Sequence, residues 1–412
     1  MTSDTRVVVI GSGLAGARLA RRLGELGTPA LLVGEEEHRP YNRVLLAEVL
    51  AGRYEPDVIA LPGLTAPAEP LRARVTGIDR EARTVRCADG SVVPYGTLVL
   101  ATGSNPVLPP LRGLFTPGGR ELPEGVHAFR TMDDCLGLSK AVRPSARAVV
   151  IGGGLLGVSA ARALAVRGAQ VVLAQQAERL MERQLDPAAS RLVGRHLRDL
   201  GVEVHTECRV RGVRVVAGAV RSVELADGYT LDADLLVLAC GVRPRVGLAR
   251  TAGLTVGEGV LVDDELRTSD PHIHAIGDCA QHDGTLYGLA APALDQADTL
   301  AALLSGSTTA RYTGTRALTR LTLAGRAPAG LAPFDLAAFG ETQPRPGDDV
   351  VQLADATRGT YRKVVVRDDR LVGGVLVGEL GTVGALARAW EGAEPLPADG
   401  PLLHLLTHDG GS

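Results

Sequence analysis

The sequence of 412 residues contains few cysteines, and no two of them are neighbours in the sequence. The five cysteines are far apart, and no two form a CxxC or CxxxxC motif: Cys87, Cys135, Cys208, Cys240 and Cys279. This spacing excludes the redox dithiol of disulfide reductases and the paired thiols of a structural zinc site. His272 and His274 share one face of a strand pattern, but no third ligand accompanies them. We therefore predict no metal site.

The sequence also lacks a large excess of charge of one sign and long apolar runs. Lys and Arg number 44 and Asp and Glu number 47, so the formal net charge of -3 argues against a dedicated nucleic-acid binder. No stretch approaches the roughly 20 consecutive apolar residues of a membrane-spanning helix. The N-terminal residues lack the apolar core of a secretory signal. We expect a cytoplasmic protein that binds neither nucleic acid nor a membrane.

Glycine, in contrast, is abundant at 51 residues, and part of it forms an internal repeat. A GxGxxG motif at residues 11–16 follows a short apolar run and precedes a helical pattern, and the same order returns at residues 152–157. Each copy ends in an apolar strand pattern followed by Ala-x-Gly-x-x-Pro, at residues 101–106 and 239–244. Two motifs with matching flanks predict two Rossmann-like dinucleotide-binding units.

The chemistry of these units requires the three glycines of each motif. The first allows a tight turn from strand to helix, the second lets the backbone approach a pyrophosphate, and the third lets the helix pack closely on the strand. The phosphates then lie against unpaired amides at the helix N-terminus, where the helix dipole favours an anion.

The residues after the second strand of each unit bear on the choice of dinucleotide. Glu35 lies about 20 residues beyond the first glycine turn, where a carboxylate accepts the ribose hydroxyls of an adenosine without a 2′-phosphate, as in FAD or NAD. Glu35 can also be read as part of a solvated acidic turn. The second unit has Gln175 and Gln176 at this place, with Arg179 and Arg183 downstream. NADH and NADPH both stay open, and the pattern leans toward NADPH.

Three longer segments accompany the glycine motifs, at Arg39–Gly52, Leu180–Asp186 and Ala275–Ala280. Together they resemble the two-dinucleotide-binding flavoprotein reductases, which include ferredoxin and rubredoxin reductases and the large subunit of NAD(P)H nitrite reductase. The first two segments look most like the nitrite reductase branch. The resemblance implies an FAD-dependent NAD(P)H oxidoreductase, in which a hydride passes to the flavin and electrons then pass to a separate acceptor, such as a ferredoxin, a rubredoxin or a nitrite or nitrate reductase component.

The resemblance also implies the cofactor contacts of each unit. We name no catalytic residue, because hydride transfer from the nicotinamide to the flavin requires no side-chain acid or base. FAD contacts are expected, by position, from Gly11, Gly13, Ala15, Gly16, Glu35, Arg43, Val75, Ala101, Thr102, Gly103, Arg130, Gly277, Asp278 and Ala291. Asp278 is expected at the ribityl or pyrophosphate part of FAD. NAD(P)H contacts are expected from Gly152, Gly154, Leu155, Leu156, Gly157, Gln175 and Gly241.

Two positions depart from the family pattern. Glu48 occupies a segment where many relatives place a Lys beside the flavin, and Ser159 stands where many have a Glu. A cation near the flavin stabilises its anionic reduced form, whereas Glu48 would disfavour that form if it points inward. These departures keep open a nucleotide-sensing protein with little turnover. A second alternative is a pathway-specific reductase or oxidase acting on a small molecule.

The predicted fold class is α/β, with two Rossmann-like domains that bind FAD and NAD(P) and a small α+β C-terminal domain. We expect the FAD domain to be split between residues 1–112 and 247–318, around an NAD(P)H domain at 113–246. Short strand patterns predict the third domain over 319–412, which covers the flavin or forms a subunit contact in a possible homo-oligomer. Its tail, from Glu394, is expected to be flexible.

Overall fold

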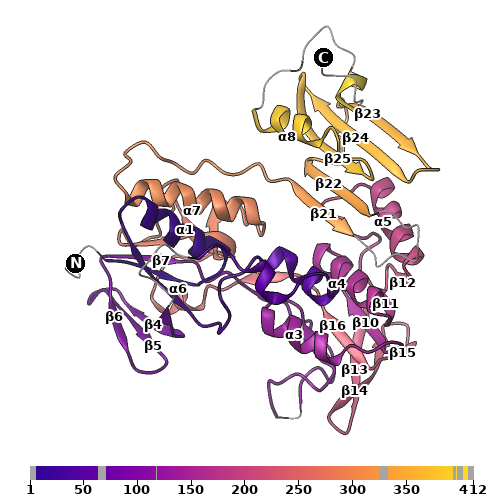
Figure 1. Ribbon diagram of the computed structural model, residues 1–412, viewed down its shortest axis with the longest axis horizontal. Coiled ribbons are helices and arrows are strands. Elements are labelled where there is room, and N and C mark those ends of the chain that lie inside the picture. Colours follow the sequence, from indigo (N-terminus) through magenta and orange to yellow (C-terminus); the bar gives the residue numbers. More distant parts are fainter. Residues whose placement is uncertain are drawn as a thin grey trace. The chain divides into compact units, whose positions relative to one another are not determined.

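The computed structural model describes residues 6–63, 71–116, 118–323, 333–392, 396 and 402–406 (Figure 1). Most of the tail from Glu394, which we expected to be flexible, lies outside these residues. The chain divides into two compact units, each built from three segments. The first unit comprises Met1–Leu46, Tyr54–Asn105 and Val242–Thr315, and the second comprises Ala47–Arg53, Pro106–Gly241 and Arg316–Ser412.

The first unit contains a parallel sheet of five strands in the order β19-β7-β1-β2-β3. The bounds are β1 (Val7–Ile10), β2 (Ala30–Gly34), β3 (Leu71–Arg72), β7 (Thr97–Leu100) and β19 (Ile273–Ala275). The central strands are runs of buried Val, Leu and Ile, which is typical of a parallel sheet covered on both faces. In its register, Val8 lies between Leu31 and Leu98.

Two layers cover this sheet. On one face lie two helices that pack side by side (Figure 1), α1 (Leu14–Glu25) and α7 (Ala290–Leu304). On the other lie the short helix α6 (Gly247–Thr251) and an antiparallel meander of β4 (Val75–Asp79), β5 (Thr84–Cys87) and β6 (Val92–Pro94). The remaining elements are β8 (Ser104–Pro106) paired with β17 (Val242–Pro244), β18 (Val260–Val262) paired with β20 (Ala280–His282), and 3₁₀ helices at Arg43–Leu45, Pro56–Ile59 and Gly277–Cys279.

The second unit repeats this plan. Its five-stranded parallel sheet has the order β12-β11-β10-β16-β9, with β9 (Val126–Ala128), β10 (Arg147–Ile151), β11 (Gln170–Ala174), β12 (Val202–His205) and β16 (Leu235–Leu238). Its helices are α2 (Leu46–Leu50), which begins at the last residue of the first unit, α3 (Met132–Ala141), α4 (Leu155–Val166) and α5 (Pro187–Asp199). A meander of β13 (Val210–Val216), β14 (Ala219–Leu225) and β15 (Thr230–Asp232) corresponds to that of the first unit.

The C-terminal part of the second unit is an antiparallel sheet in the order β21-β22-β25-β24-β23. Its elements are β21 (Thr319–Leu323), β22 (Phe334–Gly340), β23 (Asp349–Asp355), β24 (Thr360–Arg367), β25 (Arg370–Val377), α8 (Val383–Gly392) and a 3₁₀ helix at Leu402–Leu406. Asp368 and Asp369 have φ angles of 49° and 56°, as the tight turn between β24 and β25 requires. In its core, the rings of Phe339 and Trp390 lie 5.2 Å apart.

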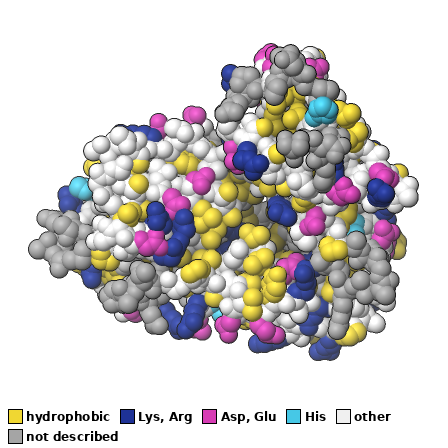
Figure 2. Space-filling view, turned by 45° about the horizontal axis from the view of Figure 1, so that its top comes forward, with side chains coloured by type: hydrophobic (Ala, Val, Ile, Leu, Met, Phe, Trp, Pro, Cys, Tyr) yellow, Lys and Arg dark blue, Asp and Glu magenta, His cyan; other side chains and the backbone are white. Residues whose placement is uncertain are grey.

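The predicted fold class is therefore confirmed: two Rossmann-like parallel sheets and a small C-terminal sheet with a helix. The cofactor assigned to each domain, and the domain boundaries, stay predictions. Residues 47–53, which we expected inside the first domain, group with the second unit. Among the described residues, no helix is both long and apolar enough to cross a membrane. Basic and acidic side chains are interspersed over the face seen in Figure 2.

Candidate functional site

The first glycine turn joins β1 to α1, and two of its glycines allow close backbone contacts. Gly11 has a φ of 112°, and a Cβ there would lie 2.1 Å from the carbonyl oxygen of Ala101, at the end of β7. A Cβ at Gly16 would lie 1.9 Å from the carbonyl oxygen of Gly11. Because no side chain fits at these distances, the turn can only be built with glycine at both positions.

The N-terminus of α1 is open to an anion. Gly13 is the N-cap residue, so the cap position offers no side chain to accept from the first amides, and the first turn of α1 contains no acidic residue. A Cβ at Gly13 would meet no described atom within 4 Å, so the backbone is accessible here. Gly277, with a φ of 75°, approaches the same turn, since a Cβ there would lie 3.0 Å from that of Ala15. This is the geometry that binds phosphate at a helix N-terminus.

Polar groups meet where β7 and β19 end. The Ser104 hydroxyl donates to the Asp278 carboxylate at 2.8 Å, and the Gly277 amide donates to the Gln296 side chain at 2.7 Å. On the neighbouring loop, the Thr102 hydroxyl donates to the Arg245 carbonyl at 2.9 Å, and the Arg245 amide donates to the Gly103 carbonyl at 2.9 Å. The structure thus brings the predicted residues 101–103 and 277–278 to the carboxyl edge of one sheet, where ligands of such sheets bind.

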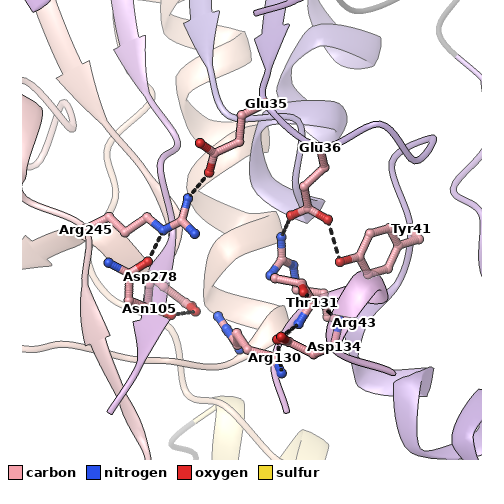
Figure 3. Close-up of polar contacts among 11 residues, drawn as sticks. Glu35, Glu36, Tyr41, Arg43, Asn105, Arg130, Thr131, Asp134, Arg245 and Asp278 are labelled. Carbon is pink, nitrogen blue, oxygen red and sulfur yellow. Dashed lines mark hydrogen bonds and ion pairs between the residues drawn. The ribbon is translucent and has the colours of Figure 1, made fainter. Parts of the chain in front are cut away.

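Glu35 lies at this edge with a partner that the sequence analysis did not find. In Figure 3 the Arg245 guanidinium lies between the Glu35 carboxylate, with which it forms an ion pair, and the Asn105 side chain, to which it donates a hydrogen bond. Arg74 lies 3.8 Å from the other oxygen of Glu35. Glu35 is therefore ion-paired with Arg245 through one oxygen, and its side chain is 40% exposed. Because a carboxylate oxygen can accept more than one hydrogen bond, this pairing leaves the predicted contact with ribose hydroxyls open.

Glu36 organises the segment that contains Arg43. The Tyr41 hydroxyl donates to Glu36 at 2.7 Å, and the Arg43 guanidinium forms an ion pair with Glu36 while lying 5.4 Å above the Tyr41 ring (Figure 3). These three side chains and the glycine turn line a small hollow, together with neighbours of the same unit: Ser12, Gly13, His38, Arg39 and Pro40. Arg43 is thus held beside the phosphate-binding geometry of α1.

Three predicted FAD contacts lie outside these groups. Val75 is the first residue of β4 in the meander and is buried in the core of the first unit, and Ala291 is exposed in the first turn of α7. Arg130 belongs to the second unit, where its amide donates at 3.0 Å to Asp134 at the start of α3. Thr131 caps the same helix with its hydroxyl, which accepts from the Asp134 amide at 3.1 Å.

The second glycine turn, between β10 and α4, has the same geometry. Gly152 has a φ of 110°, and a Cβ there would lie 2.4 Å from the Ala239 carbonyl oxygen. A Cβ at Gly157 would lie 1.7 Å from the Gly152 carbonyl oxygen. Gly154 is the N-cap residue, without a capping side chain and without described atoms near its Cβ position. The predicted contacts Leu155 and Leu156 form the first turn of α4, whose amides are open in the same way.

Gln175 braces this second turn. Its side-chain oxygen accepts from the Gly153 amide at 2.7 Å, and its side-chain nitrogen donates to the Arg179 carbonyl at 3.2 Å. Gly241, with a φ of 98°, follows Cys240, whose thiol has a pKa raised to about 11 by burial. Burial likewise raises the pKa of the Cys279 thiol, so neither cysteine is an activated nucleophile.

The two departures from the family pattern have defined partners. The Ser159 hydroxyl donates to the Leu155 carbonyl one turn earlier in α4, at 2.8 Å. Glu48 forms ion pairs with Arg53 and with the buried Arg162, a residue that the sequence analysis did not single out. In the part of the chain that the structure describes, no three His, Cys, Asp or Glu side chains gather as a metal site.

Comparison with known proteins places this geometry among flavoprotein reductases. Residues 5–297 match the family described as Pyridine nucleotide-disulphide oxidoreductase, and residues 332–391 match the Rubredoxin NAD+ reductase C-terminal domain. Nitrite reductase [NAD(P)H] of Bacillus subtilis is 34% identical over 382 residues, 91% of this chain but 46% of that protein. The chain thus spans about half the length of this relative.

Two further proteins match along most of their length. Rubredoxin-NAD(+) reductase of Alcanivorax borkumensis is 32% identical over 314 residues, which cover 74% of this chain and 79% of the relative. The structure of putidaredoxin reductase in its covalent complex with putidaredoxin superimposes with a TM-score of 0.84 at 26% identity. That match covers 97% of this chain and 98% of the other.

Proposed function

The chain belongs to the pyridine nucleotide-disulphide oxidoreductase family, and we propose that it is an FAD-dependent NAD(P)H oxidoreductase that passes electrons to a separate acceptor. The resemblance read from the sequence is thereby confirmed at the level of the family. The observation that carries the proposal is the pair of glycine turns, each followed by a helix whose N-cap residue is a glycine and therefore has no capping side chain. One chain with two such turns can hold two dinucleotides.

We assign FAD to the first unit. The residues fit this group, because a side chain larger than hydrogen at Gly11 or Gly16 would collide with backbone, whereas the space above Gly13 is open for a pyrophosphate. Asp278, held by Ser104 at the end of β19, suits the hydroxyls of a ribityl chain. The remaining predicted FAD contacts, including Val75, Arg130 and Ala291, are part of the same proposal.

We assign NAD(P)H to the second unit, where Gly154 and the first turn of α4 would bind its pyrophosphate. When both groups are bound, they supply the redox chemistry, in which a hydride passes from the nicotinamide to the flavin. The protein's contribution is to bind and orient the two groups, so no side-chain acid or base is needed for this step. Gln175 carries no charge that would repel a 2′-phosphate, and we propose NADPH as the preferred donor.

The acceptor is proposed from the names of the relatives. They include a nitrite reductase, a rubredoxin reductase and a putidaredoxin reductase in covalent complex with putidaredoxin, and the last two names give a redox protein as the partner. Since the chain spans about half of the nitrite reductase relative, the activity of that whole protein is not assigned to it. We propose a small electron-transfer protein as the acceptor and the cytoplasm as the location.

The test is anaerobic addition of NADPH or NADH to the FAD-loaded chain. In a reductase, the flavin absorbance near 450 nm is lost on a time scale of about seconds, because hydride transfer between a well-oriented nicotinamide and flavin is fast. The faster donor identifies the preferred nucleotide. A flavin that keeps its absorbance for many minutes with both donors would contradict the proposed function and favour a nucleotide-sensing protein.

A further inference from the structure

A seven-residue excursion of the chain carries a buried ion pair. Residues 47–53 belong to the second unit, whereas the chain before and after them belongs to the first. The excursion contains most of α2 and a closing turn, in which the amides of Ala51, Gly52 and Arg53 donate to carbonyl groups of α2 at 2.9–3.0 Å. Ala47, Val49 and Leu50 are buried. The excursion is thus packed into the second unit rather than looped out in solvent.

Glu48 and Arg162 form the pair that holds this excursion. One oxygen of the Glu48 carboxylate accepts from the guanidinium of Arg162 in α4, whose side chain is 0% exposed against 13% for Glu48. Burial lowers the pKa of Arg162, and the carboxylate of Glu48 opposes this shift. The other oxygen accepts from Arg53 at 3.0 Å, a side chain that is 43% exposed. A buried guanidinium requires a partner of opposite charge, so the ion pair with Arg162 holds the Glu48 side chain against α4.

A second contact on α4 supports the same arrangement. Arg167, directly after α4, donates to the Leu50 carbonyl at 3.4 Å and to the Ser139 hydroxyl of α3 at 2.5 Å. The carboxyl end of α2 is thereby fixed from the same helix that carries Arg162. Since α4 also begins at the second glycine turn, one helix connects the proposed nicotinamide site to the excursion.

The residues that precede the excursion carry part of the proposed flavin site. Arg43 and Tyr41 pair with Glu36, and the chain continues from the 3₁₀ helix at Arg43–Leu45 directly into α2. Four residues lie between Arg43 and Glu48, so a clamp on Glu48 restricts where Arg43 can lie. Arg162 also balances the charge of Glu48, which would disfavour the anionic reduced flavin if it pointed inward.

We propose that Glu48 and Arg162 are a positioning pair for flavin reduction: they hold the excursion on α4 and so fix the flavin-side segment that ends at α2. Neither side chain is assigned a step of the chemistry. The inference rests on the proposed function. It accounts for one departure from the family pattern, because Arg162 supplies the charge that complements Glu48.

Hydrogen exchange of the full chain as purified tests the clamp. The variants are Arg162→Gln, Glu48→Gln and their combination, with Arg53→Gln as the matched control that removes only the exposed partner of Glu48. We expect the amides of residues 51–53 to exchange about tenfold faster in each single variant, because the excursion opens locally. In the double variant these amides are expected to exchange within twofold of the rate in the faster-exchanging single variant. In Arg53→Gln they are expected to exchange within twofold of the rate in the unmodified chain.

Rapid-mixing measurements on the FAD-loaded proteins test the positioning role. Arg162→Gln is expected to lower the limiting rate of flavin reduction by about tenfold, since a misplacement near 1 Å has effects of this size or more. The dissociation constant of the nucleotide is expected to change less than about threefold. A general loss of structure would instead weaken nucleotide binding along with the rate. Arg162→Lys, which keeps the charge, should recover most of the rate.

The outcomes separate the two proposals. An unmodified chain whose flavin neither nucleotide reduces contradicts the proposed function, while the exchange data still decide whether the clamp exists. An unmodified chain that is reduced normally, with Arg162→Gln and Glu48→Gln within twofold of it, overturns the positioning pair. Strictly multiplicative losses in the double variant overturn it as well, because they show independent residues. If Arg162→Gln does not fold, Glu48→Gln carries the test.

Discussion

At the scale of single residues, Gln175 is the side chain that we propose to set the choice of donor. Its oxygen accepts from the amide of Gly153 inside the glycine turn, and its nitrogen donates to the carbonyl of Arg179. A carboxylate could keep the first of these hydrogen bonds and would lose the second. It would also place a negative charge where a 2′-phosphate is expected to lie.

We predict that Gln175→Glu reverses or removes the preference for NADPH. The added charge repels the 2′-phosphate and offers an acceptor to the ribose hydroxyls of NADH, so the ratio of kcat/KM for NADPH to that for NADH should fall about tenfold or more, equivalent to at least ~1.4 kcal/mol. Steady-state reduction of an artificial acceptor with each donor measures the ratio. Gln176→Glu, at the exposed neighbouring residue, serves as the control and should change the ratio less than about threefold.

An unchanged ratio in Gln175→Glu would show that this side chain does not face the adenosine ribose. The site would then have to be assigned to other residues after β11.

At the scale of elements, the start of α5 is joined to the C-terminal sheet by a buried polar cluster. Asp186 is the N-cap residue of α5 and accepts from the Ala189 amide at 3.0 Å. From β24, the Tyr361 hydroxyl donates to Asp186 at 2.5 Å and the Lys363 ammonium at 2.9 Å. Lys363 also donates to the Thr342 carbonyl at 3.0 Å. Asp186 thus satisfies a helix terminus and two strand side chains at once.

We predict that Lys363→Met destabilises the C-terminal sheet by about 3–5 kcal/mol, because it leaves the Asp186 carboxylate buried without its cation. Tyr361→Phe, which removes one hydrogen bond, should cost only about 1–2 kcal/mol. Urea unfolding followed by the fluorescence of Trp390, the single tryptophan and a core residue of this sheet, measures both. A midpoint unchanged by Lys363→Met would show that the cluster contributes nothing to the packing of the sheet on α5.

The same cluster predicts a pH dependence. Burial alone raises the pKa of Asp186, but the hydrogen bonds from Ala189, Tyr361 and Lys363 outweigh it and set the pKa below the ordinary value of 3.8. A carboxyl whose folded pKa is lowered stabilises the fold above its unfolded pKa and loses this contribution as the pH falls through the folded value. Asp186→Asn should therefore reduce the free energy of unfolding at neutral pH and flatten its decline below about pH 4. An equally steep decline in the variant would assign the acid sensitivity to other carboxyls.

At the scale of the whole molecule, the sequence predicted what depends on local pattern. Both glycine turns and the strands that flank them follow from residue types within a few positions of each other. It did not predict Arg245 or Arg162, because their partners Glu35 and Glu48 are 210 and 114 residues away. The membership of residues 47–53 in the second unit was missed for the same reason, since it arises from tertiary packing.

The measurement that tests the central claim most directly is the FAD content of the purified full chain, read from its absorbance spectrum after incubation with excess FAD and gel filtration. Because FAD is assigned to the first glycine turn and NAD(P)H to the second, we predict about one FAD per chain, retained through the column. Gly11→Ala, which places a Cβ 2.1 Å from the Ala101 carbonyl oxygen, should retain far less. A chain that remains colourless after the same treatment would contradict the assignment of the first unit and the function built on it.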